Sequence, residues 1–448
     1  MTEVTLLEML DARERRTERQ QDLLQKFGST LICFTMNIAG PIKISDAIIR
    51  AFREGCSKIR YRIPEDRIIY QELLEEKTGC EAYFVVNDNA IKVKEICASI
   101  EDETELGRLF DIDVIDSRGE KLDRSCVNGK SRDCIVCGAA GRGCASRRLH
   151  TVAELQFTTN QIINNHFAKM DSEQIGGFAV QSLLEEVHTT PKPGLVDCND
   201  SGSHKDMDLH TFIASATALK PYFVKCVKIG QETSGEPVDT VFKLLQKEGI
   251  RAEECMYNAT KGINTHKGAI YIFGILCGAI GRCWTAEEPI SDLEKILQSL
   301  KEIAEYAIEK TYQRLEYDHE VTTTGEQLLL HKGIKGVRGE VAEGLPSVIK
   351  IGVPVYRECI RNGLDHNYAG CITLLHLIKN VSDTNLYKRG GEEGVRYVVK
   401  EVERLLEASE RPTLDEISLL NEKFVQRNLS PGGCADLLAV TYFVNKLI

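Results

Sequence analysis

Residues 185–197 read Glu185-Glu-Val-His-Thr-Thr-Pro-Lys-Pro-Gly-Leu-Val-Asp197, a stretch that ends one helix and delays the start of the next. Pro191 and Pro193 each remove a backbone donor and fix φ, and Gly194 permits a turn. The stretch therefore predicts a rigid loop between two helices, set with polar side chains.

A second polar run, Ser201-Gly-Ser-His-Lys-Asp-Met-Asp208, follows this loop and is expected to open the next helix. Ser203 is the expected N-cap, with Asp206 in the first helical turn. Histidines, lysines and aspartates concentrated between two helices favour a functional site. A solvated loop followed by an ordinary N-cap is the structural alternative.

On both sides of this loop, from Ser172 onward, apolar residues recur at helical spacing and strand signals nearly vanish. Lys388–Gly391 is the clearest internal loop of this half. The segments expected to be helical are 174–187, 208–227, 252–262, 268–282, 290–315, 393–408 and 414–427. This half is predicted to be all-α.

The first half has a mixed pattern. Three short runs rich in β-branched and aromatic residues, 31–36, 82–86 and 109–115, are expected to be strands. Helical patterns cover 6–24, 46–59 and 66–77, and a further helix is expected to start near Arg148. The chain is therefore predicted to have two domains, an α+β domain at residues 1–168 and an all-α domain at residues 172–448.

Composition limits the class of protein. The formal net charge of −11 over 448 residues argues against non-specific binding to nucleic acid. The apolar run Gly268–Gly281 is shorter than the about 20 residues that a spanning helix needs, and no signal-peptide pattern opens the chain. The 16 cysteines are expected to be mostly reduced and buried, which favours a cytoplasmic protein.

Three stretches of the second half have the sequence features of anion-binding sites. Asn264–Gly268 and Ser430–Asp436 are expected helix N-termini, capped by Thr265 and by Ser430 with Pro431 as first helical residue. The glycine-rich basic run His331–Gly339 is suited to a polyphosphate. Each stretch alone is equally consistent with plain capping; together they favour a ligand with several phosphates.

Carboxylates recur beside these loops, and Glu340 and Glu343 share one helix face. A polyphosphate substrate usually arrives with Mg²⁺, which takes one or two carboxylates and keeps several waters. Surface carboxylates without a metal are the alternative. The carboxylates concerned are Asp206, Asp208, Glu326, Glu340, Glu343, Asp365 and Asp383.

Six motifs of this half resemble the triphosphoribosyl-dephospho-CoA synthase family over essentially all of residues 172–448. They are His188–Asp197, Ser201–Asp208, Asn264–Ala269, Thr323–Glu326, Asp383–Asn385 with Arg389–Gly391, and Ser430–Leu438. The resemblance implies an all-α fold that uses ATP and 3'-dephospho-CoA. In that reaction the 2'-hydroxyl of dephospho-CoA displaces adenine from the ribose C1' of ATP and leaves the triphosphate intact.

Displacement at an anomeric carbon needs nearby carboxylates, a base and a proton donor. The candidate catalytic residues are His188, His204, Asp206, His266, Glu326 and Glu340, with His188, His204 and His266 proposed for proton transfer. The candidate phosphate-binding residues are Lys192, Lys205, Lys267, Lys332, Arg338, Arg389, Ser430, Gly432 and Gly433. Asp206 and Asp208 are the candidate Mg²⁺ ligands.

In the first half, Asp111 and Asp113 lie two apart on an expected strand, so both carboxylates face the same side. Such a pair can act in catalysis by holding Mg²⁺ against a pyrophosphate leaving group, although a strand with a polar face is the plainer alternative. Downstream arginines, among them Arg124, Arg132 and Arg147, are candidate phosphate partners.

Cys134, Cys137 and Cys144 are candidate Zn²⁺ ligands, with Cys126 or His150 as the fourth. Unliganded thiols, buried or partly exposed, are the alternative.

Residues 1–168 resemble the apo-citrate lyase phosphoribosyl-dephospho-CoA transferase family. The motifs are Phe34–Ile38 with Gly40-Pro41, Gly107–Val114, Arg132–Cys137, and Cys144-Ala145 with His150. The pattern departs at Ser146, where the family's arginine is expected, and Arg147 is the candidate replacement. The resemblance implies transfer of the phosphoribosyl-dephospho-CoA group to a serine of the citrate lyase acyl carrier (gamma) subunit, with release of pyrophosphate.

The substrate of the second family's reaction is the product of the first, so a bifunctional enzyme is the leading hypothesis. Arg13, Arg15, Arg16 and Arg19 on the first helix could dock an acidic carrier or form a solvated face. Two other hypotheses remain open: one half is catalytic and the other only docks the carrier, or the chain is a nucleotide- or CoA-sensing scaffold. Because a related enzyme for malonate decarboxylase uses the same intermediate, the carrier is inferred mainly from the first half.

Overall fold

The computed structural model describes residues 2–127, 132–139, 144, 147–290, 292–318 and 336–448. Glu326, Lys332 and the motif Thr323–Glu326 lie outside these residues. The chain divides into two compact units, residues 1–169 with 285–289, and residues 170–284 with 290–448. Among the described helices, none combines the length and the apolar character needed to cross a membrane.

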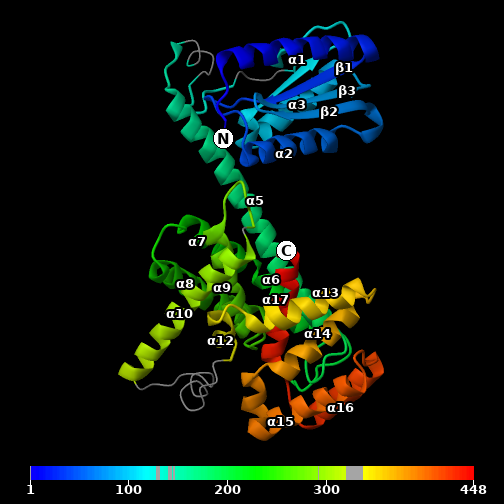
Figure 1. The fold of residues 1–448 in the computed structure, drawn as a ribbon, viewed down its shortest axis with the longest axis vertical. Coiled ribbons are helices and arrows are strands. Elements are labelled where there is room, and N and C mark those ends of the chain that lie inside the picture. The colour runs from blue at the N-terminus through cyan, green and yellow to red at the C-terminus, as the bar shows by residue number, and fades with distance from the viewer. Residues whose placement is uncertain (1, 128–131, 140–143, 145–146, 291, 319–335) are drawn as a thin grey trace. The chain divides into compact units, whose positions relative to one another are not determined.

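The first unit is a four-stranded antiparallel sheet with helices on both faces (Figure 1). The spatial order of its strands is β2-β3-β1-β4. Its elements are α1 (Leu6–Phe27), β1 (Thr30–Met36), α2 (Asp46–Arg62), β2 (Ile68–Glu76), β3 (Gly79–Val86), α3 (Ala90–Glu103) and β4 (Phe110–Ile115), with short 3-10 turns at Glu65–Arg67, Leu106–Leu109 and Arg124–Val127. This unit has the predicted α+β composition.

Successive side chains along each strand point to opposite faces of the sheet and pack into two separate cores. Leu31, Cys33 and Tyr83 pack with Leu23 of α1 on one face. On the other face Phe34 stacks on Phe52 of α2, with ring centroids 5.2 Å apart. The sheet is thus buried on both sides, and the register of β1 is set by these two cores.

The prediction of a helix over 66–77 is wrong, because residues 68–76 form β2 and pair with β3. Its glutamates face both sides of the sheet, which hides the period of two that a strand normally shows. Glu72 pairs with Arg19 of α1 at 2.8 Å, and Glu75 pairs with Arg53 of α2 at 2.7 Å.

The same contacts occupy much of the basic face of α1. Besides Arg19, Arg15 pairs with Glu76 at 3.3 Å and Arg16 with Glu81 at 2.6 Å. Three of the four arginines considered for carrier docking therefore hold the helix to its own sheet.

Helix α5 (Val152–His188) runs through the predicted boundary without a break. Its residues up to Lys169 belong to the first unit and the rest to the second. The helix expected to start near Arg148 is therefore present, but the chain has no helix break at the predicted boundary between residues 168 and 172. Thr151 and Glu154 form a capping box at its start, and Pro191 with Pro193 follow its end.

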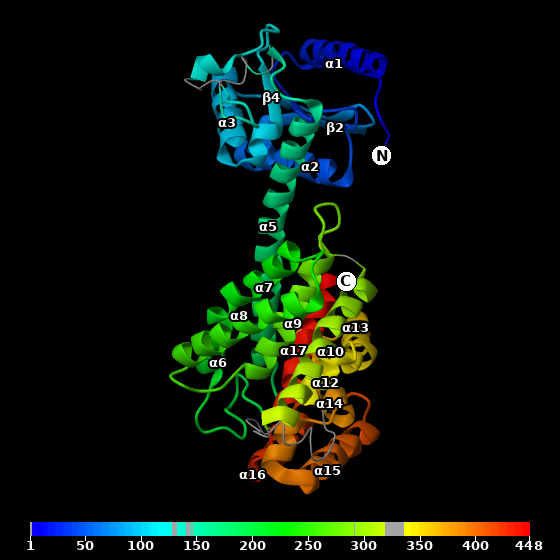
Figure 2. The same cartoon turned by 90° about the vertical axis from the view of Figure 1, so that its left-hand side faces the viewer.

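The second unit is helical (Figures 1 and 2). The predicted helix at 208–227 is two helices, because Pro221 opens a new one after Leu219. The helices after α5 are α6 (Leu209–Ala218), α7 (Lys220–Glu232), α8 (Val238–Ala259), α9 (Lys267–Cys283), α10 (Leu293–Asp318), α12 (Gly336–Ala342), α13 (Val353–Arg361), α14 (His366–Asn380), α15 (Thr384–Ala408), α16 (Leu414–Gln426) and α17 (Gly432–Leu447), with a π-helical turn at Val348–Gly352.

Close approach of small residues holds the centre of this unit together. A Cβ on Gly281 of α9 would lie 2.0 Å from the carbonyl oxygen of Val227 in α7. Helix α17 is apolar on nearly all sides and packs against α9, α13, α14 and α15. The predicted loop at 388–391 instead lies inside α15, which only kinks at Gly391, where φ is +60°.

Candidate functional site

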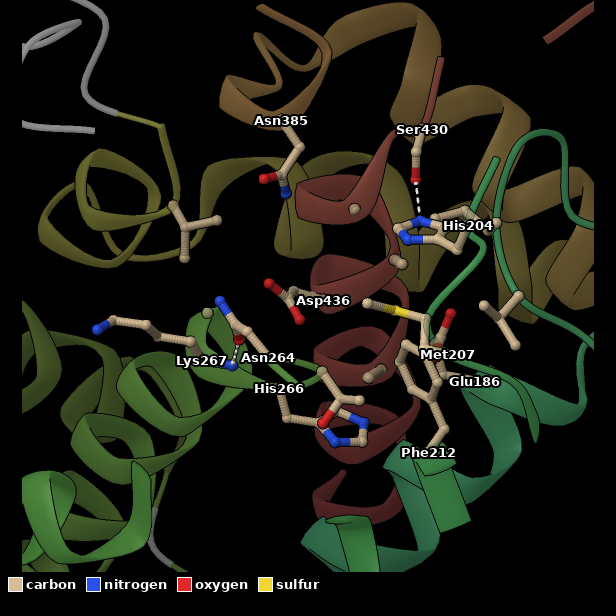
Figure 3. A pocket seen from close by; sticks show the side chains of 18 of the residues that line it. Glu186, His204, Met207, Phe212, Asn264, His266, Lys267, Asn385, Ser430 and Asp436 are labelled. Atoms are coloured by element: carbon tan, nitrogen blue, oxygen red, sulfur yellow. Dashed lines mark hydrogen bonds between the residues drawn. The ribbon is translucent and has the colours of Figure 1, made fainter. Parts of the chain in front are cut away.

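The second unit contains a cavity of about 600 Å³ (Figure 3). The loop after α5 and the N-terminal ends of α9, α12, α15 and α17 contribute to its wall. The side chains labelled in Figure 3 are Glu186, His204, Met207, Phe212, Asn264, His266, Lys267, Asn385, Ser430 and Asp436. Segments far apart in the sequence thus meet at one site.

The loop after α5 positions Lys192 in this wall. Its ammonium group, 1% exposed, forms a short ion pair with Glu186 in the last turns of α5. Its backbone N–H donates to the carboxylate of Asp197 at 2.8 Å. Gly194 allows the loop to turn, with φ of +74°, and a Cβ there would lie 2.2 Å from the carbonyl oxygen of Leu429. The loop is therefore rigid, as predicted.

His204 connects Arg389 to Ser430 at one side of the cavity. Arg389 donates to Nδ1 of His204 at 3.1 Å, so in the neutral ring Nε2 carries the hydrogen and donates to Ser430 Oγ at 2.9 Å. Burial, and then the charge of Arg389, lower the pKa of His204 to about 4. The hydroxyl of Ser430 is thereby left to donate its own hydrogen to a ligand.

His266 lies at another side of the cavity and is 3% exposed. Its Nδ1 is 2.7 Å from Ser215 Oγ, and Ser215 accepts from Thr265 at 2.7 Å. Its Nε2 is buried and has no hydrogen-bond partner among the described residues. Burial, and then the charge of Lys192, lower the pKa of His266 to about 3. The ring is therefore neutral at physiological pH.

Asp436 projects from α17 near the middle of the labelled side chains (Figure 3). Burial, and then the charges of Glu186 and Asp383, raise its pKa well above the ordinary value. A raised pKa favours the protonated form of this carboxyl group, in which it can donate a hydrogen. Gly268 in the first turn of α9 makes room for it, because a Cβ there would lie 2.1 Å from Asp436 Oδ2.

We expect Gly268→Ala to lower turnover at this cavity at least about tenfold while changing the free energy of unfolding by roughly 1 kcal/mol or less. The added methyl group meets a movable carboxylate, so Asp436 swings away and the packing survives. Gly249→Ala in α8 is the control, since its Cβ would be in ordinary contact at 3.5 Å from Tyr222. Steady-state kinetics with thermal unfolding measure both effects. Full activity in Gly268→Ala would contradict this role for the Gly268–Asp436 contact.

Basic side chains lie along the same cavity. Lys267, the first residue of α9, pairs with Glu253 at 2.7 Å. Arg338 of α12 lies over the ring of Tyr271 at 5.6 Å. The N-cap of α9 is His266, whose side chain makes no cap, and the Lys267 N–H donates instead to Asn264 Oδ1 at 3.3 Å. Lys267, Arg338 and Arg389 give the cavity an anion-binding character.

Most of the described residues that were predicted for a site in the second unit line this cavity. They are Lys192, His204, Asp206, His266, Lys267, Arg338, Arg389, Ser430 and Gly432.

Five predicted residues are not part of the wall and have other contacts. His188 is exposed and its Nδ1 contacts the carbonyl oxygen of Leu184 at 2.7 Å. Asp208, and not the predicted Ser203, caps α6 by accepting from the Thr211 N–H at 2.8 Å. Glu340 holds Ser347, Lys205 is exposed, and Gly433 packs against Asp383.

Two other predicted caps have different partners. Thr265 bonds to Ser215, and the cap of α9 is His266. Ser430 bonds to His204, and the cap residue of α17 is Pro431. In the first turn of α17 the Cys434 N–H donates a hydrogen bond to the carboxylate of Asp383 at 2.9 Å. These expectations were wrong because the side chains of Thr265 and Ser430 bond to residues distant in the sequence and not to the N–H groups of the following helix.

The sequence reasoning omitted several residues of the wall, above all Glu186 and Asp436. Asp436 is the single carboxylate between Gly432 and Leu447, a helix that is otherwise almost entirely apolar. An ionisable group in such a helix is costly unless it has a function, and this signal was present in the sequence. Asn264, Phe212, Tyr271 and Asn385 carry no comparable signal.

The first unit places Asp111 and Asp113 on β4, opposite Thr35 and Cys33 of β1, so both face the same side as predicted. Asp113 pairs with Lys121 at 2.6 Å. Desolvation, and then the charge of Asp113, raise the pKa of Asp111. A divalent cation is the usual way to relieve such paired negative charge.

The predicted arginines differ in their surroundings. Arg132 binds Glu101 at 2.9 Å and the carbonyl oxygen of Phe110, and Glu101 also accepts from the Ile112 N–H at 2.9 Å. Arg124 pairs with Asp102 at 2.6 Å. Arg132 therefore braces the outer edge of β4, whereas Arg124 is held by α3. Arg147 is exposed.

The candidate metal ligands also fall into two groups. Cys134, Cys137, Cys144 and His150 come together, and Cys126 does not join them. Among the described residues, no comparable group of three carboxylates or histidines was found. Asp208 caps α6 through its Oδ1 atom, and Mg²⁺ binding by Asp206 and Asp208 stays a prediction.

Comparison with known proteins gives matches for both units. The CitG family, described as ATP:dephospho-CoA triphosphoribosyl transferase, matches residues 172–448. The CitX family, described as apo-citrate lyase phosphoribosyl-dephospho-CoA transferase, matches residues 4–166.

Two curated relatives match the whole chain. Protein CitXG of Haemophilus influenzae is 34% identical, covering 99% of this chain and 96% of its own. Protein CitXG of Leuconostoc mesenteroides subsp. cremoris is 31% identical, covering 99% and 97%. A probable 2-(5''-triphosphoribosyl)-3'-dephosphocoenzyme-A synthase of Vibrio cholerae is 37% identical, covering 61% of this chain and 88% of its own.

Proposed function

The chain belongs to the CitXG family, in which a CitX domain and a CitG domain are fused, and we propose that its two domains catalyse two successive steps of one synthesis. The C-terminal domain condenses ATP with 3'-dephospho-CoA and releases adenine. The N-terminal domain transfers the phosphoribosyl-dephospho-CoA group of that product to apo-citrate lyase. The observation that carries the first assignment is a single cavity that joins neutral acid–base groups to anion-binding side chains.

At the C-terminal site the 2'-oxygen of dephospho-CoA bonds to C1' of the ATP ribose, and the C1'–N9 bond to adenine breaks. The proton of the 2'-hydroxyl passes to solvent, from which Asp436 regains the proton that it gives to adenine. Adenine leaves with the electron pair of that bond and must gain a proton. Asp436 donates this proton, because its raised pKa favours the protonated carboxyl group. Glu186, paired with Lys192, is the carboxylate that faces the positive charge on the ribose ring in the transition state.

The triphosphate lies along the basic part of the cavity. Lys267 and the N-terminus of α9 bind one group, and Arg338 and the Ser430 hydroxyl bind others. Asp206 in the same wall is the carboxylate that would hold Mg²⁺ together with the phosphates. The ion would neutralise phosphate charge.

At the N-terminal site the hydroxyl oxygen of a carrier serine attacks the phosphorus next to the ribose, and the bond to the outer two phosphates breaks. Pyrophosphate leaves, and the serine proton passes to a base. Asp111 and Asp113 would hold Mg²⁺ at this place, where the ion would stabilise the departing pyrophosphate. Lys121 beside Asp113 adds positive charge at the same side of the sheet.

A two-step assay tests the division of labour. With ATP, Mg²⁺ and dephospho-CoA alone, the protein should form the triphosphoribosyl product without releasing pyrophosphate. Addition of the apo-carrier should then release pyrophosphate and increase the carrier mass by one phosphoribosyl-dephospho-CoA group. A carrier mass that stays constant while the intermediate accumulates would refute the N-terminal assignment and leave the C-terminal one intact.

A further inference from the structure

We propose that Cys134, Cys137, Cys144 and His150 bind one structural Zn²⁺ ion in the N-terminal unit. One ligand atom from each residue is available, and these four atoms lie within 4.8 Å of one another. Neither of the two proposed catalytic sites includes any of the four residues. The inference therefore stands independently of the reactions assigned to the chain.

The distances fit a tetrahedral centre. Sγ of Cys137 is 3.4 Å from Sγ of Cys144, and Nε2 of His150 is 3.3 Å from Sγ of Cys137. Zinc at about 2.3 Å from sulfur and about 2.0 Å from nitrogen requires ligand atoms roughly 3.5–3.8 Å apart. These two distances are within a few tenths of an ångström of that spacing, and no pair of ligand atoms is more than about 1 Å beyond it.

The backbone around Cys134 and Cys137 is already folded as a tight turn. The Gly138 N–H donates to the Cys134 carbonyl oxygen at 3.0 Å, and the Cys134 N–H donates to the Ala139 carbonyl oxygen at 2.7 Å. Gly138 has φ of +70°, which favours glycine. The turn keeps both thiols on one side, and the N–H groups of Val136 and Cys137 point toward the Cys134 sulfur.

The other two ligands come from the approach to α5. Cys144 is buried, and His150 immediately precedes Thr151, the residue whose side chain caps the helix. Thr151 and Glu154 bond to each other in both directions, at 2.7 and 3.2 Å, so the backbone beside His150 is fixed. The imidazole is thus presented to the thiols by a rigid element and not by a freely rotating loop.

The ligand chemistry selects zinc. Three thiols and one imidazole form a closed set with no position left for substrate, which is typical of a structural zinc site. Hard cations such as Mg²⁺ prefer oxygen ligands. Binding replaces the thiol protons, which pass to solvent, and it needs no oxidant or reductant.

The site would brace the transferase centre from outside. Arg132, two residues before Cys134, binds Glu101 and the Phe110 carbonyl oxygen at the edge of β4. Arg108 in addition binds the carbonyl oxygen of Asp133. A metal that links 134–137 to the start of α5 would hold this segment against the strand that carries Asp111 and Asp113. The ion acts on these residues only through their position.

Elemental analysis of the full-length purified protein tests the proposal. We expect about one zinc per chain in the wild type and in Cys126→Ser, and little or none in Cys137→Ser and His150→Ala. Cys126 is the matched control because it is an exposed cysteine of the same segment outside the cluster. Zinc loss in Cys126→Ser equal to that in Cys137→Ser would overturn the assignment of ligands.

Cobalt substitution tests the same site in the wild-type chain, without any variant. After zinc is stripped, Co²⁺ added to the wild-type chain should give thiolate-to-cobalt absorption and the intense visible bands of a tetrahedral site. Absence of these bands, iron in place of zinc, or a Cys137–Cys144 disulfide found by mass spectrometry in the freshly purified protein would each contradict the proposal. Zinc removal should lower carrier loading and leave adenine release unchanged.

Discussion

Asp436→Asn should lower the rate of adenine release about 10²- to 10⁴-fold, the range typical for loss of a general acid. Asparagine keeps the size and neutrality of the protonated side chain but cannot give up a proton to adenine. Binding of ATP should change little, because the basic side chains that hold the triphosphate are untouched. The loss should therefore appear in kcat and not in KM.

The pH dependence follows from the direction of the pKa shift. Because the pKa of Asp436 is raised, wild-type activity should hold below that pKa and fall as the pH rises through it. The same raised pKa means that the half-buried carboxyl group stabilises the fold below its unfolded pKa, and that this contribution is lost as the pH rises through the folded pKa. The Asn variant does not titrate, so it should be at least as stable as the wild type in alkaline buffer.

Asp415→Asn in the first turn of α16 is the matched control, since Asp415 is exposed. It should release adenine at the wild-type rate. A normal rate in Asp436→Asn, or a loss equal to that of the control, would remove Asp436 from the chemistry.

Asp111→Asn should lower carrier loading at least about 100-fold, comparable to the removal of one electrostatic contact with a reacting group. Neutralising Asp111 leaves Asp113 alone beside Lys121, so the paired negative charge that would hold Mg²⁺ is lost. Adenine release should stay at the wild-type rate, because Asp111 belongs to the other unit. Supplying purified intermediate and apo-carrier measures the second step by itself.

Asp66→Asn is the control in the same unit, because Asp66 is an exposed carboxylate before β2. If Asp111→Asn loaded the carrier normally, the pair on β4 would be only a polar strand face. If it also stopped adenine release, the two activities would not be separable in the way proposed.

Helical periodicity predicted most of the second unit because long amphipathic segments such as 290–315 determine their own secondary structure. The errors occurred where tertiary contacts decide. Residues 66–77 form a strand because β3 and the arginines of α1 and α2 are there to pair with them. Lys388–Gly391 remains inside α15 although two glycines suggest a loop. Such contacts depend on residues distant in the sequence.

The site was predictable where loops carry the chemistry. His204, His266 and Lys267 stand in polar loops next to glycine or proline, and the structure gathers them at one cavity. Glu186 lies inside α5, where a polar residue is usually solvated, and only the packing shows that it faces the cavity. Asp436 was overlooked, although a single carboxylate in an apolar helix is a signal that the sequence carries. The fourth Zn²⁺ ligand was also decided by the packing, because the sequence spacing alone left Cys126 and His150 equally suitable.

The most direct test of the central claim uses ATP labelled in both the adenine ring and the γ-phosphate. Incubation with purified protein, Mg²⁺ and dephospho-CoA should release the ring label as free adenine, while the γ-phosphate label enters the CoA product in equal amount. Recovery of the ring label as ADP or AMP, with the γ-phosphate label in phosphate or pyrophosphate and no free adenine, would contradict the account.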